Sequence, residues 1–480
     1  MTTAPASPDL PAAVLPGTAR RLTALLASAQ AEHRLPSVAV GLVRDGELVW
    51  WASRGLVAGA RPTPATQYRI GSITKTFVAA AVLRAVQDGL AGLDDPVGAH
   101  LPELTGTGAL TVGQLLAQSS GVRAETEGPW WERTPGGDWS TLLPQLGEEA
   151  VRLRPGTRFH YSNVGYAILG ELVARLRGRG WAEVVAEQFL RPLGMRRTTL
   201  RPSGEHAPGL AVHPWADVVL PEPEHDAGAM APAGQLWSTV GDLARWAGAL
   251  AGREPGALDP AVAASMRELQ AADDQPGGGW SSGYGLGLQL WNEGGRLHAG
   301  HSGSMPGFVA MLRADVSSGD AVLALTNSTT GFGDLPARLL AAYAEAEPPL
   351  AAEWQPQRVD ADVLELVGPW YWGPAPLVLS ATADGGLRLA GMQQRARASR
   401  LRRARAGEQG DWVGLDGYYA GEPLRVLRGP DGAVRALDLA SFRITRSPYP
   451  LEEADLVPGG VDPAGWRPGT PGGRRSGDVL

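Results

Sequence analysis

The stretch RIGSITKTFVAAAVLRAVQDGL, residues 69–90, decides how the rest of this sequence is interpreted. Its apolar side chains cover most of the circumference of the helix that it predicts, so this helix should be buried. Ser72 and Lys75 stand three residues apart at the start of the helix, and this spacing places both functional groups on one face. The unpaired amides at the helix start also favour an anion beside Ser72.

Lys75 is the only lysine in the chain, and all other basic residues apart from histidine are arginines. Arginine stays protonated in proteins, whereas a lysine ammonium loses its proton when it is desolvated or placed near another cation. A lysine kept neutral in a crowded cationic pocket can accept the proton of a serine hydroxyl, which is otherwise a weak nucleophile. We therefore predict that Ser72 is a nucleophile and that Lys75 is its base.

A second motif, Tyr161-Ser162-Asn163, comes just before another expected helix. A nearby lysine would lower the pKa of the Tyr161 phenol and make this tyrosine a second base. The Asn163 amide can accept a hydrogen bond from Lys75 and donate one to a substrate carbonyl. Taken alone, the motif has an equally good structural explanation, in which Tyr161 packs on the helix and Asn163 caps it.

The third motif lies in GHSGSMPGF, residues 300–308, where His301-Ser302-Gly303 precedes an expected strand. Gly303 lets a substrate approach a strand edge closely. The backbone amide of Ser304 can join that of Ser72 as the second donor to an oxyanion. We predict that Asn163, His301 and Gly303 make substrate or network contacts.

In this order, Ser72-Ile73-Thr74-Lys75, Tyr161-Ser162-Asn163 and His301-Ser302-Gly303 resemble the three signatures of the class C β-lactamase and D,D-peptidase family, which has family VIII-type esterases among its relatives. The resemblance covers about residues 20–345. It implies an acyl-enzyme at Ser72, formed and hydrolysed while Lys75 and Tyr161 exchange protons, with no metal or organic cofactor. Strong β-lactamases of this class usually have a lysine where this chain has His301, and histidine is more typical of the esterase and peptidase branches.

These motifs predict a serine hydrolase of the esterase, amidase or peptidase type, acting on a small ester, amide or peptide, rather than a strong β-lactamase. Two enzymatic alternatives stay open: an acyltransferase that uses the same acyl-enzyme, and a D,D-peptidase or β-lactamase. A catalytically silent binding scaffold is a different class of answer, but a scaffold has no reason to keep its only lysine beside Ser72. Trp130 and Trp131 either cover an apolar acyl pocket or anchor a loop.

The order of helix and strand signals predicts an α/β (α+β) fold. We expect an antiparallel sheet flanked by helices, built from both ends of the first 350 residues, with an all-helical lobe inserted between them. Short aromatic segments separated by turns then predict a small antiparallel β-barrel or sandwich. The expected divisions are a loose leader (1–16), the hydrolase domain (17–350), a linker (351–358), the small β domain (359–449) and a disordered tail (450–480).

Composition limits the kinds of partner. The net charge of −7 attracts neither nucleic acid nor an anionic membrane. The absence of cysteine excludes disulfides and thiolate catalysis, and the histidine pair His298 and His301 lacks a third zinc ligand. We interpret the arginine cluster at residues 395–405 as a solvated edge strand. No export signal is visible at the N-terminus, which favours a cytoplasmic location, and the oligomeric state is not predicted.

Overall fold

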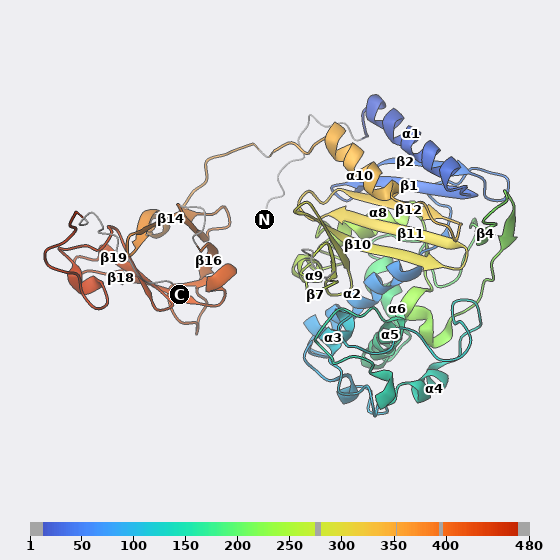
Figure 1. Ribbon diagram of the computed structural model, residues 1–480, viewed down its shortest axis with the longest axis horizontal. Helices are drawn as coiled ribbons and strands as arrows, with labels where there is room; N and C mark the ends of the chain where they lie inside the picture. The colour runs from blue at the N-terminus through green and yellow to red at the C-terminus, as the bar shows by residue number, and fades with distance from the viewer. Residues whose placement is uncertain (1–12, 274–279, 352, 393–396, 469–480) are drawn as a thin grey trace, which may run out of the picture. The chain divides into compact units, whose positions relative to one another are not determined.

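The computed structural model describes residues 13–273, 280–351, 353–392 and 397–468. The chain forms two compact units, Met1–Leu350 and Ala351–Leu480 (Figure 1). Most of the predicted leader and the last twelve residues of the predicted tail lie outside the described residues. The first helix, α1, begins at Pro16, and the described part of the tail contains a 3₁₀ turn at Ala454–Leu456.

An eight-stranded antiparallel sheet is the frame of the first unit, in the order β2-β1-β12-β11-β10-β9-β8-β7. The hairpin from the start of the chain therefore pairs with strands from the end of this unit, which confirms the predicted sheet built from both ends. The strands are β1 (Ser37–Arg44), β2 (Glu47–Gly55), β7 (Ala271–Ala272), β8 (Ser282–Tyr284), β9 (Gln289–Glu293), β10 (Arg296–Met305), β11 (Phe308–Asp315) and β12 (Ala321–Thr326).

Strand β1 is buried on both faces because helices cover both sides of the sheet at this point. Successive side chains of a strand point to opposite faces. Val38 and Leu42 accordingly pack with α1 (Pro16–Glu32) and α10 (Leu335–Ala346), while Val43 belongs to the core on the other face. Figure 1 shows α1 and α10 together on one side of the sheet.

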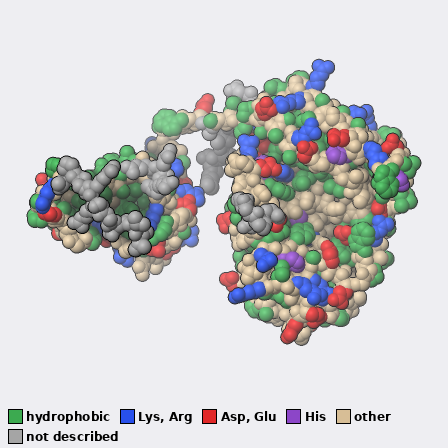
Figure 2. Space-filling model, viewed as in Figure 1, with side chains coloured by type: hydrophobic (Ala, Val, Ile, Leu, Met, Phe, Trp, Pro, Cys, Tyr) green, Lys and Arg blue, Asp and Glu red, His purple; other side chains and the backbone are tan. Residues whose placement is uncertain are grey.

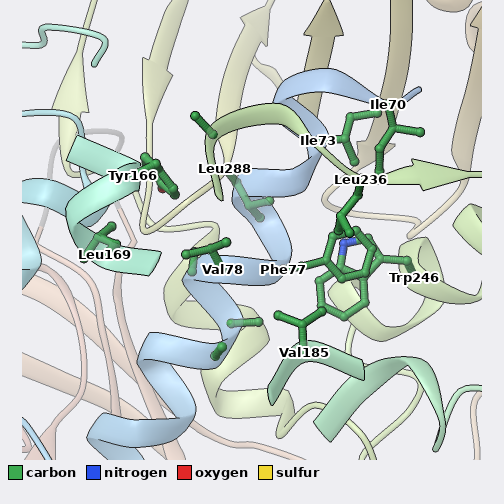
Figure 3. Packing of buried hydrophobic residues seen from close by; sticks show 14 of the residues in the cluster. Ile70, Ile73, Phe77, Val78, Tyr166, Leu169, Val185, Leu236, Trp246 and Leu288 are labelled. Atoms are coloured by element: carbon green, nitrogen blue, oxygen red, sulfur yellow. The ribbon is translucent and has the colours of Figure 1, made fainter. Parts of the chain in front are cut away.

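The helical lobe is inserted between β2 and β7, as predicted, and α2 lies in a large hydrophobic core that the lobe shares with the sheet. Phe77 of α2 stacks on Trp246 with ring centroids 4.1 Å apart (Figure 3). The Trp246 indole donates to Thr76 Oγ1 at 2.8 Å. Every residue from Thr74 to Leu83 is buried, which confirms the predicted buried helix. The helices between β2 and β7 are α2 (Thr74–Gln87), α3 (Val112–Leu116), α4 (Trp139–Leu142), α5 (Asn163–Arg177), α6 (Trp181–Val185), α7 (Ala231–Gly234), α8 (Val240–Leu250) and α9 (Pro260–Met266). Of these, α8 packs against β1 and β12 of the sheet.

Two short ribbons complete this unit. One pairs β3 (Tyr68–Arg69), which comes directly before Ser72 in the chain, with β6 (Trp237–Ser238). The other pairs β4 (Leu210–Val212) with β5 (Val219–Pro221). The first ribbon ties the segment before Ser72 to the segment that leads into α8.

The second unit is a closed barrel of eight antiparallel strands in sequence order, which decides between the predicted barrel and sandwich. Trp370 fills its core and is fully buried. The strands are β13 (Gly368–Trp372), β14 (Ala375–Ala381), β15 (Leu387–Gly391), β16 (Ser399–Arg403), β17 (Trp412–Gly414), β18 (Pro423–Arg428), β19 (Val434–Leu439) and β20 (Phe442–Thr445); a short helix, α11 (Ala361–Leu364), precedes them.

The prediction of an edge strand in the arginine cluster is wrong. Strand β16, which holds the described arginines from Arg400 to Arg403, pairs with β15 on one side and β17 on the other. A closed barrel has no edge to protect. The arginines instead form ion pairs, such as Arg402 with Glu408 at 2.6 Å. Residues 395 and 396 of the cluster lie outside the described residues.

Over the face shown in Figure 2, acidic and basic side chains alternate instead of gathering by sign. Among the described residues, none of the helices combines the length and the apolar character that crossing a bilayer requires.

Candidate active site

Ser72 lies in a 3₁₀ turn, Gly71–Ile73, that leads directly into α2. Gly71 has a φ of +52°, in the left-handed region that favours glycine. A Cβ atom on Gly71 would lie 2.4 Å from the backbone nitrogen of Ser304 in β10. The turn therefore packs backbone to backbone against this strand. Ser72 itself is only partly buried, which leaves part of the residue open to a substrate.

His301-Ser302-Gly303 precedes a strand, β11, as predicted, but the prediction missed that these three residues themselves lie inside another strand, β10. Two glycines and two serines in five residues resemble a loop in sequence, but here the glycines permit close contact: a Cβ on Gly303 would lie 1.9 Å from the carbonyl oxygen of Ile70. Strand β9 pairs only with residues 296–300 of β10. The following residues of β10 face the Ser72 turn instead.

The edge of β10 beside this turn carries backbone amides. The amide of Ser302 donates to Gln289 Oε1 at 2.8 Å, on the side where β9 pairs with the strand. Backbone amides two residues apart on a strand point in the same direction. The amide of Ser304 therefore points to the same edge, and the residue itself is exposed.

Lys75 has no exposed surface and makes three hydrogen bonds. Its Nζ atom lies 2.9 Å from Ser72 Oγ, 2.7 Å from Asn163 Oδ1 and 2.7 Å from the carbonyl oxygen of Ala233 in α7. Burial lowers the pKa of Lys75 to about 7, against the charges of Glu125 and Glu132, which raise it. The predicted cationic pocket is therefore wrong: desolvation lowers the pKa of this lysine, and the neighbouring charges are negative.

Asn163 is the first residue of α5, but it does not cap the helix. The cap is Ser162, whose hydroxyl accepts from the amide of Gly165 at 2.9 Å. This cap leaves the Asn163 side chain available to Lys75. The structural explanation in which Asn163 is the helix cap is therefore wrong.

Tyr161 lies directly before this helix with its ring over the lysine, 4.9 Å from Nζ to the ring centroid. Burial raises the pKa of Tyr161 well above its usual range, and the phenol of Tyr284 and the charge of Glu125 raise it further. The prediction that a nearby lysine would lower this pKa is wrong, because burial is the largest effect on the phenol and it raises the pKa. Tyr161 is thus a phenol, not a phenolate, near neutral pH.

His301 is fully buried, and the protein satisfies both of its ring nitrogens. Nδ1 lies 2.5 Å from the carbonyl oxygen of Ser302, which can only accept, so Nδ1 carries the hydrogen. Nε2 then accepts from the Tyr284 hydroxyl at 2.8 Å. Burial, together with the smaller effect of the charge of Lys75, lowers the pKa of His301 to about 3. Of the two predicted roles, this geometry fits the network contact and leaves no ring nitrogen for a substrate.

Glu125 was not predicted from the sequence, yet it contacts the site directly. One carboxylate oxygen accepts from Asn163 Nδ2 at 2.7 Å, and the other accepts from the Trp131 indole at 2.6 Å. Trp131 is 6% exposed, so it anchors the loop rather than covering a pocket, whereas Trp130 is 59% exposed. The one signal in the sequence was Trp131 itself, because a buried indole needs a hydrogen-bond acceptor.

The beta-lactamase family model matches residues 22–346, well over half of the chain. The chain belongs to the beta-lactamase family. This finding confirms the resemblance on which the sequence interpretation rested. A second model, described as a domain of unknown function (DUF7586), matches residues 359–446, which lie in the barrel unit.

Three proteins illustrate the range of similarity to this beta-lactamase family member. Penicillin-binding protein 4 of Amycolatopsis lactamdurans is 28% identical over 356 residues, which cover 68% of this chain and 92% of that protein. SurE, whose crystal structure is known, is 26% identical to this chain in sequence, and its structure matches with a TM-score of 0.58. The match covers 90% of this chain and 99% of SurE. The D-amino acid amidase of Ochrobactrum anthropi SV3, solved with D-phenylalanine, shares the fold at 22% identity and a TM-score of 0.58, covering 68% of this chain and 100% of the amidase.

In this beta-lactamase family member, the two histidines of β10 do not form a metal site. His298 and His301 are three residues apart on a strand, so their side chains point to opposite faces. His298 is hydrogen-bonded to Arg313 at 3.2 Å and His301 to Tyr284. Among the described residues, no three histidine, aspartate or glutamate side chains are grouped so as to hold a metal ion.

Proposed function

We propose that this protein is a serine hydrolase that cleaves a small ester or amide through an acyl-enzyme at Ser72. The observation that carries the proposal is the hydrogen bond of 2.9 Å between Lys75 Nζ and Ser72 Oγ, made by a lysine that is fully buried. A buried amine with a pKa of about 7 is neutral in about half of the molecules at pH 7 and can take the serine proton. Membership of the beta-lactamase family supports the same chemistry.

The first half of the reaction forms the acyl-enzyme. The Ser72 proton passes to the Lys75 lone pair as Oγ bonds to the substrate carbonyl carbon, and the backbone amides of Ser72 and Ser304 hold the resulting oxyanion. The oxyanion then collapses and breaks the bond to the leaving group. The proton on Lys75 reaches the leaving atom through Tyr161, which gives up its own phenolic proton and takes the one from the lysine.

The second half consumes one water molecule. Water gives a proton to Lys75 through Tyr161 while its oxygen bonds to the acyl carbon, and the same two amides hold the second oxyanion. Ser72 Oγ then leaves and takes the proton back from Lys75. The enzyme returns to its starting state with the acid released, and the atoms of one water are divided between the two products.

The site favours neutral esters and amides over β-lactams that carry a carboxylate. His301, at the position where strong β-lactamases have a lysine, is neutral and bonded on both nitrogens, so it presents no positive charge to a substrate carboxylate. The carboxylates of Glu125 and Glu132 are close enough to raise the pKa of Lys75, and their negative charge repels anions. We therefore expect esterase or amidase activity to exceed β-lactam hydrolysis.

The proposal is tested by measuring kcat/KM for p-nitrophenyl esters, D- and L-amino-acid amides and nitrocefin, with the wild-type protein and with Ser72→Ala. SurE was solved with D-Leu, so D-leucine amide and esters belong in the panel. We expect turnover of at least one ester or amide, loss of that turnover in Ser72→Ala, and slower hydrolysis of nitrocefin. Faster release of the acyl group when an alcohol is added would show acyl transfer. Turnover that survives in Ser72→Ala would contradict the mechanism, and no turnover of any substrate would favour a binding scaffold.

A further inference from the structure

Glu125 contacts the site without touching the nucleophile or its base. We propose that Glu125 is a positioning residue: it fixes the direction of the hydrogen bonds around Asn163 and thereby keeps the Lys75 lone pair free for the Ser72 hydroxyl. The inference rests on the proposed function, because it assigns a role in activating the same serine. It adds a residue that belongs to none of the three motifs.

The direction of the hydrogen bonds begins at Trp131. An indole N–H can only donate, so the Glu125 oxygen at 2.6 Å accepts from it. An ionised carboxylate can only accept, so the other Glu125 oxygen accepts from the Asn163 amide nitrogen at 2.7 Å. Because one end of the Asn163 amide is held by Glu125, the oxygen is the end that faces Lys75, at 2.7 Å. The carboxylate thus determines which atom of Asn163 the lysine meets.

The lysine is sensitive to this choice. A neutral amine has two N–H donors and one lone pair, and Lys75 has three partners. The oxygens of Asn163 and Ala233 can only accept, so together they use both N–H groups. The lone pair then remains for Ser72, whose hydroxyl is the one partner of the three that can donate. This is the arrangement that a general base needs before it takes a proton.

The opposite orientation of Asn163 would place its NH₂ group against Lys75. The lysine lone pair would then accept from the amide, and one N–H group would turn to Ser72, which would accept instead of donating. In that state the serine proton has no base within reach. Glu125→Gln should produce this state, because Trp131 takes the new carbonyl oxygen and leaves the new NH₂ group facing Asn163.

Charge gives Glu125 a second, separable effect. The groups that act on Lys75 are the carboxylates of Glu125 and Glu132, which raise its pKa, and the neutral rings of His301, Tyr161 and Tyr166 packed around it. Removing either carboxylate charge lowers the pKa of Lys75 further. The rise of kcat/KM with pH, which follows deprotonation of Lys75, should therefore move to lower pH in both Glu125→Gln and Glu132→Gln.

The test compares full pH profiles of kcat and kcat/KM for the full-length protein and its variants on the best ester of the panel. Glu132→Gln is the matched control, because this substitution also removes a negative charge that acts on Lys75. The Glu132 carboxylate accepts from the Trp130 indole and not from Asn163, so the substitution leaves the hydrogen bonds of Asn163 in place. We expect both variants to shift the rise to lower pH, while only Glu125→Gln lowers the plateau of kcat, by about 10- to 100-fold, the range for a misdirected hydrogen bond to a charged or polar group.

A double variant separates hydrogen-bond direction from general damage. In Glu125→Gln/Trp131→Phe the glutamine no longer has to turn its oxygen to an indole and can turn it to Asn163. The plateau should recover at least several-fold relative to Glu125→Gln, although Trp131→Phe alone lowers activity modestly. Recovery of activity by a second substitution that removes a buried contact is not expected if Glu125 acts only on stability.

Two results would overturn this inference: an unchanged plateau in Glu125→Gln, or a double variant no more active than the product of the two single effects. Melting temperatures of all variants show whether each protein is folded. Glu125→Ala introduces no new donor, so its plateau of kcat should fall less than that of Glu125→Gln. Failure of the proposed function gives a different result, because Ser72→Ala would then keep its activity whatever happens at Glu125.

Discussion

Replacing Lys75 with methionine should abolish turnover and at the same time make the protein more stable at pH 7. Burial lowers the pKa of this lysine from 10.5 to about 7. At neutral pH and below, this fall in pKa corresponds to a cost of roughly 5 kcal/mol for burying the lysine on folding. Methionine is apolar, has a similar length and removes this cost. It also leaves Asn163 Oδ1 and the carbonyl of Ala233 without a donor, at about 1–2 kcal/mol each.

The expected net stabilisation of Lys75→Met is therefore about 1–3 kcal/mol at pH 7. Its sign depends on pH. Between the folded pKa and the unfolded pKa the unfolded chain binds the extra proton, so the wild-type protein gains stability as the pH rises through this range. By pH 9 only about 2 kcal/mol of the lysine cost is left, and the advantage of methionine should have vanished.

The assay is urea unfolding of wild type and Lys75→Met at pH 7 and pH 9, with Lys75→Arg as the control. Arginine cannot lose its proton in this site, so Lys75→Arg should be both inactive and less stable than wild type at either pH. A Lys75→Met protein that is less stable than wild type at pH 7, or a stability difference that does not change with pH, would refute the reasoning that Lys75 is held neutral by burial.

Three further predictions concern the proton path, the turn beside Ser72 and the sheet. Tyr161→Phe should lower kcat by about 10²- to 10⁴-fold with little change in melting temperature, because it removes a proton relay and leaves the ring in place; a loss under threefold would exclude that role. Gly303→Ala should lower kcat/KM at least tenfold and also lower the melting temperature, since the new Cβ would lie 1.9 Å from the Ile70 oxygen; full activity would show that β10 and the turn can separate freely. Asp320→Ala should lower the free energy of unfolding by about 2–4 kcal/mol in urea titrations, because it leaves Arg44, whose side chain is 13% exposed, without its carboxylate partner; a change below 1 kcal/mol would mean that Arg44 finds another partner.

Local signals were sufficient to predict much of the fold and the centre of the site. The spacing of Ser72 and Lys75 at a helix start requires no tertiary information, and the apolar character of residues 74–83 predicted a buried helix. The β1–β2 hairpin likewise turns at Asp45-Gly46, a residue pair that favours tight turns. Each of these features depends on residues that are close together in the sequence.

The features that were missed depend on contacts between distant segments. The glycines of β10 resemble a loop until the Ser72 turn is placed against them. The pKa of Tyr161 depends on how deeply other elements bury it, and Tyr284, one of the groups that raise that pKa, is more than a hundred residues away in sequence. Glu125 carries no motif, and its role depends on Asn163, which is 38 residues away. Closure of the barrel, which removed the predicted edge strand, is also set by pairing between its first and last strands.

The central claim is that Lys75 activates Ser72 for attack on a carbonyl, and the direct measurement is covalent labelling. Wild type, Ser72→Ala and Lys75→Met are incubated with a fluorophosphonate, and the intact mass and the labelled peptide are determined over time. The account predicts one adduct per chain on Ser72 in the wild type, no adduct in Ser72→Ala and labelling slowed by orders of magnitude in Lys75→Met. A label on another serine, or labelling at the wild-type rate in Lys75→Met, would contradict it.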